Sequence, residues 1–245
     1  MQTEKVTMNP QLQKFIKIKN LHKALAERGY VGKPLEKESM YLYTRKISKT
    51  LDETLIFSKN INFDCLGNCT LHVGSITTRA VSMSIGVDQP DVKVDEYNPE
   101  VTCVLVVNAL WLRWNREPEK APLYKNDYIF DKPGGIDRLI TDVDSVVAEF
   151  VRSVSSERAL ADMLCDLESY PKQIRWGGKP RSSNPYIYAA ILYAANAEKE
   201  LALEALNKGE RAYDSAASSE HWQQARFKRY TREMQAIQRW VADMG

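Results

Sequence analysis

Cysteine and histidine side chains, which suit metal binding and nucleophilic chemistry, come close together at one place in this chain of 245 residues. Cys65, Cys69 and His72 lie near each other, with Asp64 beside them, and zinc prefers thiolate and imidazole ligands. The spacing is not CxxC, and no second pair follows. If 69–73 forms a strand, Cys69 and His72 point to opposite faces and cannot converge on one ion. We therefore expect no metal site.

Other reactive groups also lack the neighbours that catalysis or cofactor binding requires. Cys165 lies within an apolar helical pattern beside Leu164, which favours a buried, inert thiol. Gly134-Gly135 precedes a helix, but the phosphate-loop lysine and the preceding strand are missing. The remaining histidines, His22 and His221, lie in no nucleophile motif. We expect a non-enzymatic protein without a cofactor, and an enzyme whose site is assembled from distant residues stays open.

The clearest helical pattern, from about 136 to 154, separates apolar from acidic residues. Its apolar side consists of Ile136, Leu139, Ile140, Val143, Val147, Phe150, Val151 and Val154. Opposite these we expect an exposed face for binding a protein partner, formed by Asp137, Asp142, Asp144 and Glu149. Such carboxylates could mimic phosphates for a basic cleft. Two alternatives are a merely solvated face and internal pairing with Arg226, Arg229 and Arg232 of the last helix.

A second possible function is binding of nucleic acid. The last helix is basic, with Arg226, Lys228, Arg229, Arg232 and Arg239. A loop at 172–181 also combines basic residues with Trp176, and aromatic side chains among basic groups can bind single strands. The whole chain argues against this function, because 34 Lys+Arg against 32 Asp+Glu give a net charge of only +2.

The expected compartment is the cytoplasm. The start of the chain has charged residues throughout and no apolar run typical of a signal peptide. No stretch of about 18 apolar residues occurs, so we expect no membrane span. Four cysteines in so long a chain are too few for a secreted disulfide framework, which favours free thiols.

The elements that must position these residues indicate an α+β fold. A first helix is expected from Asn9-Pro10 to Gly29. Strands are expected at 41–46, 55–57, 69–73 and 80–87, with a turn at Gly67-Asn68 and a strand or helix start at 101–107. Short connections favour an antiparallel β-meander sheet, followed by a C-terminal helical region.

The helical region is expected to contain helices at 136–154, 157–169, 186–195 and 198–215, and a last helix capped by Ser218 or Ser219. Residues 186–217 resemble one tetratricopeptide unit, but only one copy occurs, so an ordinary antiparallel helix pair is the favoured interpretation. The proline-rich stretch 117–135 suggests a boundary between 1–117 and 118–245. The alternative is that the helices pack on the sheet as a single domain.

Some of these features resemble a known group of proteins. They are a helix that ends in Leu25-x-x-x-Gly29-Tyr30, the strand Tyr41-Leu42-Tyr43, the meander, and the segment from Trp111 to Trp114. Together they resemble an uncharacterised bacterial domain family, some members of which are immunity proteins beside polymorphic or contact-dependent toxins. The resemblance covers about residues 10–170 and supplies no catalytic residues. It implies a protein that binds and neutralises a cognate toxin domain.

Overall fold

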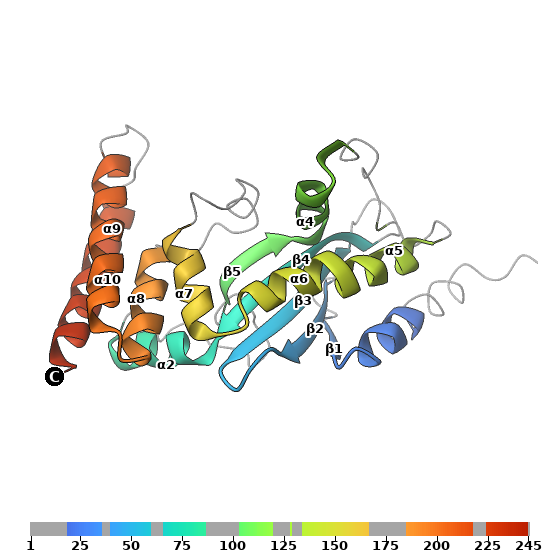
Figure 1. Ribbon diagram of the computed structural model, residues 1–245, viewed down its shortest axis with the longest axis horizontal. Coiled ribbons are helices and arrows are strands. Elements are labelled where there is room, and N and C mark those ends of the chain that lie inside the picture. The colour runs from blue at the N-terminus through green and yellow to red at the C-terminus, as the bar shows by residue number, and fades with distance from the viewer. Residues whose placement is uncertain are drawn as a thin grey trace, which may run out of the picture.

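The protein has the expected α+β architecture, with an N-terminal helix, an antiparallel sheet and C-terminal helices (Figure 1). The computed structural model describes residues 19–35, 40–59, 66–86, 103–119, 128, 134–166, 185–217 and 224–244. The expected loop at 88–100, nearly all of the expected loop at 171–185, and most of 117–135 lie outside these ranges.

The sheet is a five-stranded meander in which each strand pairs antiparallel with the next. Its strands are β1 (Val31–Leu35), β2 (Met40–Lys46), β3 (Leu51–Lys59), β4 (Leu66–Ser75) and β5 (Cys103–Asn108). β5 pairs with β4 even though a helix lies between them in the sequence. The expected antiparallel meander is therefore confirmed.

The N-terminal helix, described over 19–26, stops where the sequence predicted. Gly29 takes a positive φ of 81°, which glycine adopts without strain. The backbone N–H of Tyr30 then donates to the carbonyl of Leu25 at 3.1 Å. Leu21 and Leu25 are buried, so this helix packs into the core. The expected start at Asn9-Pro10 lies outside the described residues.

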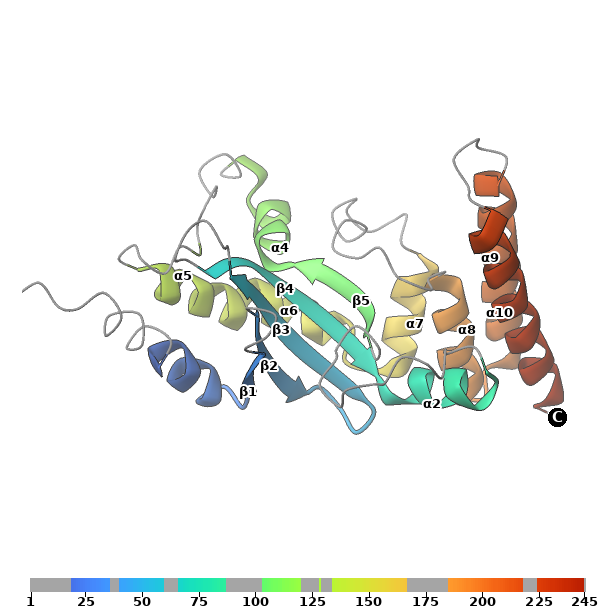
Figure 2. The same ribbon diagram turned by 180° about the vertical axis from the view of Figure 1, so that it is seen from behind.

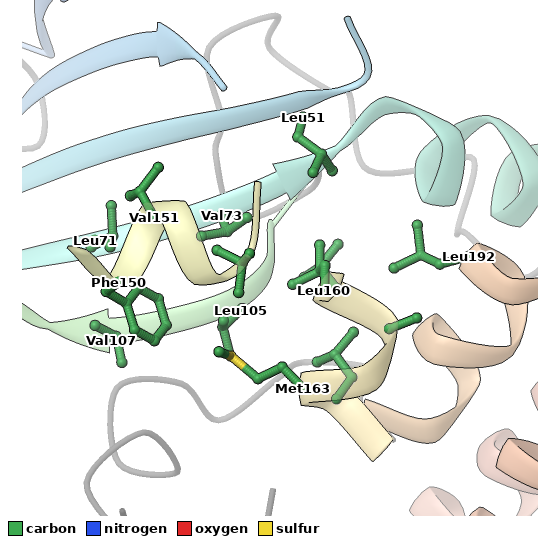
Figure 3. Close-up of a cluster of buried hydrophobic side chains, with 14 of the residues drawn as sticks. Leu51, Leu71, Val73, Leu105, Val107, Phe150, Val151, Leu160, Met163 and Leu192 are labelled. Atoms are coloured by element: carbon green, nitrogen blue, oxygen red, sulfur yellow. The ribbon is translucent and has the colours of Figure 1, made fainter. Parts of the chain in front are cut away.

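One face of the sheet is covered by a helical segment that runs across it (Figures 1 and 2). Its parts are α5 (Gly135–Asp142), the π-helix η3 (Val143–Val147) and α6 (Ala148–Ser153). All eight apolar residues expected on its inner side are buried or partly buried. Figure 3 shows Phe150 and Val151 of α6 close to Leu71 and Val73 of β4.

The C-terminal helices pack around α8, which is apolar on nearly all sides. They are α7 (Glu157–Cys165), α8 (Pro185–Ala195), α9 (Lys199–Ala217) and α10 (Gln224–Asp243). The expected helix pair at 186–217 is thus confirmed as α8 and α9. No helix in the described ranges is both long enough and apolar enough to span a membrane.

Two expectations about local structure are wrong. Residues 80–87 do not form a strand, because α2 (Ile76–Ser84) is a helix capped by Ser75, whose Oγ accepts from the N–H of Thr78 at 3.1 Å. Gly67-Asn68 does not form a turn, because both residues lie inside β4. The described part of the ambiguous stretch at 101–107 lies in a strand, β5, and α4 (Ala109–Arg116) follows β5 directly.

The buried side chains form one connected cluster that includes residues on both sides of residue 117. Leu51 of β3, Leu160 of α7 and Leu192 of α8 lie near one another where the sheet meets the C-terminal helices (Figure 3). The division into 1–117 and 118–245 stays a prediction.

Candidate functional site

The segment α5–η3–α6 carries all four acidic residues expected to contact a partner, and it divides them between two flanks. Within α5, about 100° per residue separates Asp137 from Asp142, so that they lie on different flanks of the apolar side. Asp144 contacts Arg28, whereas Asp142 and Glu149 both contact arginines of α4. Asp137, Asp144 and Glu149 are exposed, whereas Asp142 is buried. A single exposed face that includes Asp142 is therefore wrong, because Asp142 lies against Tyr128 and against Arg113 of α4.

Asp142 is held inside the protein by two donors. The hydroxyl of Tyr128 donates to its Oδ2, and Nη1 of Arg113, on α4, lies 3.4 Å from the same oxygen. Burial raises the pKa of Tyr128, and the nearby Asp142 carboxylate raises it further. A buried carboxylate is stable only with such partners. Asp142 thus braces the segment against α4 and is not accessible to another molecule.

Asp144 forms a bidentate ion pair with Arg28, which follows the N-terminal helix. Nε and Nη2 of Arg28 donate to the two carboxylate oxygens, each at 2.6 Å. The hydrogen bonds from Arg28 lower the pKa of Asp144, and the same contact raises the pKa of Arg28. Two parallel bonds fix the orientation of both groups. This pair fixes the opposite flank of the segment to the end of the N-terminal helix, and its two residues are 116 positions apart in the sequence.

Behind Arg28 lies a buried ionic cluster that the sequence analysis missed. Arg45 donates to the carbonyl of Arg28 at 3.1 Å and pairs with Oε1 of Glu53 at 2.6 Å. The Arg45 guanidinium also lies 4.5 Å from the centre of the Tyr30 ring, and the Tyr30 hydroxyl donates to Glu53. Glu53 is fully buried, and its Oε2 has no hydrogen-bond partner among the described residues. Arg45 therefore links the Arg28–Asp144 pair to the sheet interior.

Glu149 has a much looser partner. Its Oε2 lies 3.3 Å from Nη1 of Arg116, and both side chains are more than half exposed. Exposed ion pairs of this kind contribute about 0–1 kcal/mol to stability. Asp137, Asp144 and Glu149 are thus the exposed acidic residues of the segment, and of these Asp144 is already held by Arg28 in a close ion pair. The alternative of internal pairing is met among the described residues by Arg28, Arg113 and Arg116. Pairing with Arg226 or Arg229 stays a prediction, because those side chains lie outside the described residues.

The basic residues of the last helix are described only in part. Arg232 and Arg239 are exposed on α10. The side chains of Arg226, Lys228 and Arg229 lie outside the described residues, as does the loop at 172–181. Use of this surface for nucleic acid stays a prediction.

Cys69 and His72 lie on opposite faces of β4, as the strand pattern predicted. Cys69 is completely buried, and burial raises the pKa of its thiol, so the reactive thiolate is disfavoured. Burial also lowers the pKa of His72 to about 4, which keeps the ring neutral. The described part of the chain contains no group of three or more His, Cys, Asp or Glu that could hold a metal ion. Cys65 lies outside that part.

Cys165 at the end of α7 is only partly buried, whereas a fully buried thiol was expected. Burial raises its pKa, and a contact with Tyr193 of α8 lowers it by less. The Tyr193 hydroxyl also donates to Asp162 at 2.7 Å. These groups connect α7 to α8, and the net upward shift of the thiol pKa disfavours nucleophilic chemistry.

Helix α2 has an unusual distribution of side chains. Its buried face contains Thr78 and Ser82, while Ile76 and Met83 are 45% and 58% exposed. Ala80 between them is also exposed. The Thr78 hydroxyl is buried with no hydrogen-bond partner among the described residues. The helix thus presents an apolar stripe to solvent.

Comparisons with known proteins assign the chain to no family. No protein-family model matches the sequence, and neither a curated protein nor a solved structure shows significant similarity to it.

Proposed function

We propose that this chain is a non-enzymatic protein that binds and neutralises a cognate bacterial toxin domain. The observation that supports this role is a rigid helical segment with accessible carboxylates. Arg28 and Arg113 hold α5–η3–α6 from its two flanks, while Asp137 and Glu149 stay exposed. A surface held in one conformation loses little entropy when a partner binds. We place this binding in the cytoplasm.

The proposed contact residues are Asp137 and Glu149, which would meet basic groups of the partner. Asp142 and Asp144 contribute indirectly, because their arginine partners fix the segment that carries the contact residues. Charge complementarity of this kind accelerates encounter and weakens as salt screens it. Cys69 is buried and His72 is only partly exposed, so neither reactive side chain lies open at the surface, which also favours a binding role for the surface.

The test uses the polypeptide encoded beside this chain in the genome, purified as the candidate toxin domain. Calorimetric titration at low and physiological salt measures its affinity for the wild-type protein. The double variant Asp137→Lys, Glu149→Lys should bind at least about tenfold more weakly, because each reversed charge would repel the partner. Its free energy of unfolding should change by about 0.5 kcal/mol per site or less, since both positions are exposed.

The matched control is Glu200→Lys, Glu210→Lys on α9, which changes net charge equally at two other exposed positions. Equal weakening by both double variants would show that net charge matters and this surface does not. Unchanged affinity in the first variant would reject the proposed surface. No binding by the wild-type protein, together with no rescue of cells that express the toxin domain, would reject the proposed function.

A further inference from the structure

We draw no further inference here: the strongest candidate, the exposed apolar stripe of Ile76, Ala80 and Met83 on α2, is an unpartnered helix face, and nothing in the described part of the structure shows what covers it.

Discussion

Glu53 and Asp142 show how two carboxylates are accommodated inside this protein. Each accepts a hydrogen bond from a tyrosine hydroxyl and lies beside one arginine. Desolvation of a carboxylate is unfavourable by several kcal/mol, and only paired charges and hydrogen bonds offset it. Both arginine side chains are partly exposed: that of Arg113 is 18% exposed and that of Arg45 is 32% exposed. Both carboxylates therefore depend on partners that reach inward from the protein surface.

We predict that Glu53→Gln destabilises the protein by roughly 3 kcal/mol. The amide retains the shape of the side chain but leaves Arg45 without its countercharge, which is the usual penalty for breaking a buried pair. Urea denaturation measures the change. The control is Glu149→Gln, which removes the loose, exposed pair with Arg116 and should change stability by less than about 1 kcal/mol. Similar losses of unfolding free energy in both variants would show that the buried pair contributes no more to stability than the exposed pair.

At the scale of elements, the Arg28–Asp144 pair joins the N-terminal helix to η3, and its contribution should depend on pH. The pKa of Asp144 is lowered in the folded protein from the ordinary value of 3.8. Its stabilising contribution is therefore fully present above that value and is lost as the pH falls through the lower, folded pKa. The pair is partly exposed, so the contribution should be about 0.5–1 kcal/mol.

The measurement compares wild type with Arg28→Ala by urea denaturation between pH 3 and pH 7. The stability difference should be constant above about pH 5 and shrink below about pH 4. In an Asp144→Asn background, Arg28→Ala should show no such pH dependence. A difference that persists at low pH in the native background would mean that Arg28 acts through its other bond, from Nη1 to the carbonyl of Ala24 at 2.8 Å.

The turn between α8 and α9 offers a stabilising substitution. Ala197 has a φ of 61°, and the bonds Ala197 N–H to Ala194 O and Glu198 N–H to Tyr193 O close the helix end in the Schellman pattern. Glycine is the preferred residue at this left-handed position. We predict that Ala197→Gly raises the unfolding free energy by about 0.5–1 kcal/mol.

Thermal and urea unfolding test this prediction. The control is Ala212→Gly, at an exposed position inside α9, where glycine should destabilise by about 1 kcal/mol. Destabilisation by both substitutions would show that the left-handed conformation of Ala197 imposes no appreciable strain.

Local signals in the sequence predicted several helix ends, whereas the strands β3 and β4 are longer than expected and α7 ends at Cys165. Gly29 ends the N-terminal helix, Ser156 caps α7 by accepting from the N–H of Ala159 at 3.1 Å, and Pro185 begins α8. These features depend on residues a few positions apart. The alternation of side chains at 80–87 led to a wrong prediction of a strand, because alternation over so short a stretch is also compatible with a helix. The N-cap formed by Ser75 favours the helix α2.

The candidate site could be predicted only in part, because its contacts are long-range. Nothing near Asp144 in the sequence indicates Arg28, and nothing near Asp142 indicates Tyr128. One signal was available for the buried cluster: Glu53 lies between Leu51 and Leu55 on the inward-facing side of β3. A charged residue at such a position needs a buried partner, and Arg45 is its direct neighbour across β2 and β3.

At the scale of the whole molecule, the connected core predicts that sheet and helices unfold together. Leu160 of α7 is fully buried where β3 approaches α8 (Figure 3). Leu160→Ala should lower the unfolding free energy by about 2–5 kcal/mol, because the truncated side chain leaves a cavity. Hydrogen exchange measured by mass spectrometry, under conditions in which global opening dominates, reports the stability of each region separately.

In this variant the amides of β3 and those of α9 should lose protection by the same free energy, because one cooperative unit has one global opening. The control is Leu203→Ala on α9, where the side chain is 40% exposed and truncation should have little effect. If α9 alone loses protection in Leu160→Ala while β3 keeps it, the two halves open independently. The sheet and the helices after α6 would then be two cooperative units, and the protection of α5–η3–α6 would show which unit includes this segment and therefore whether the boundary lies at residue 117.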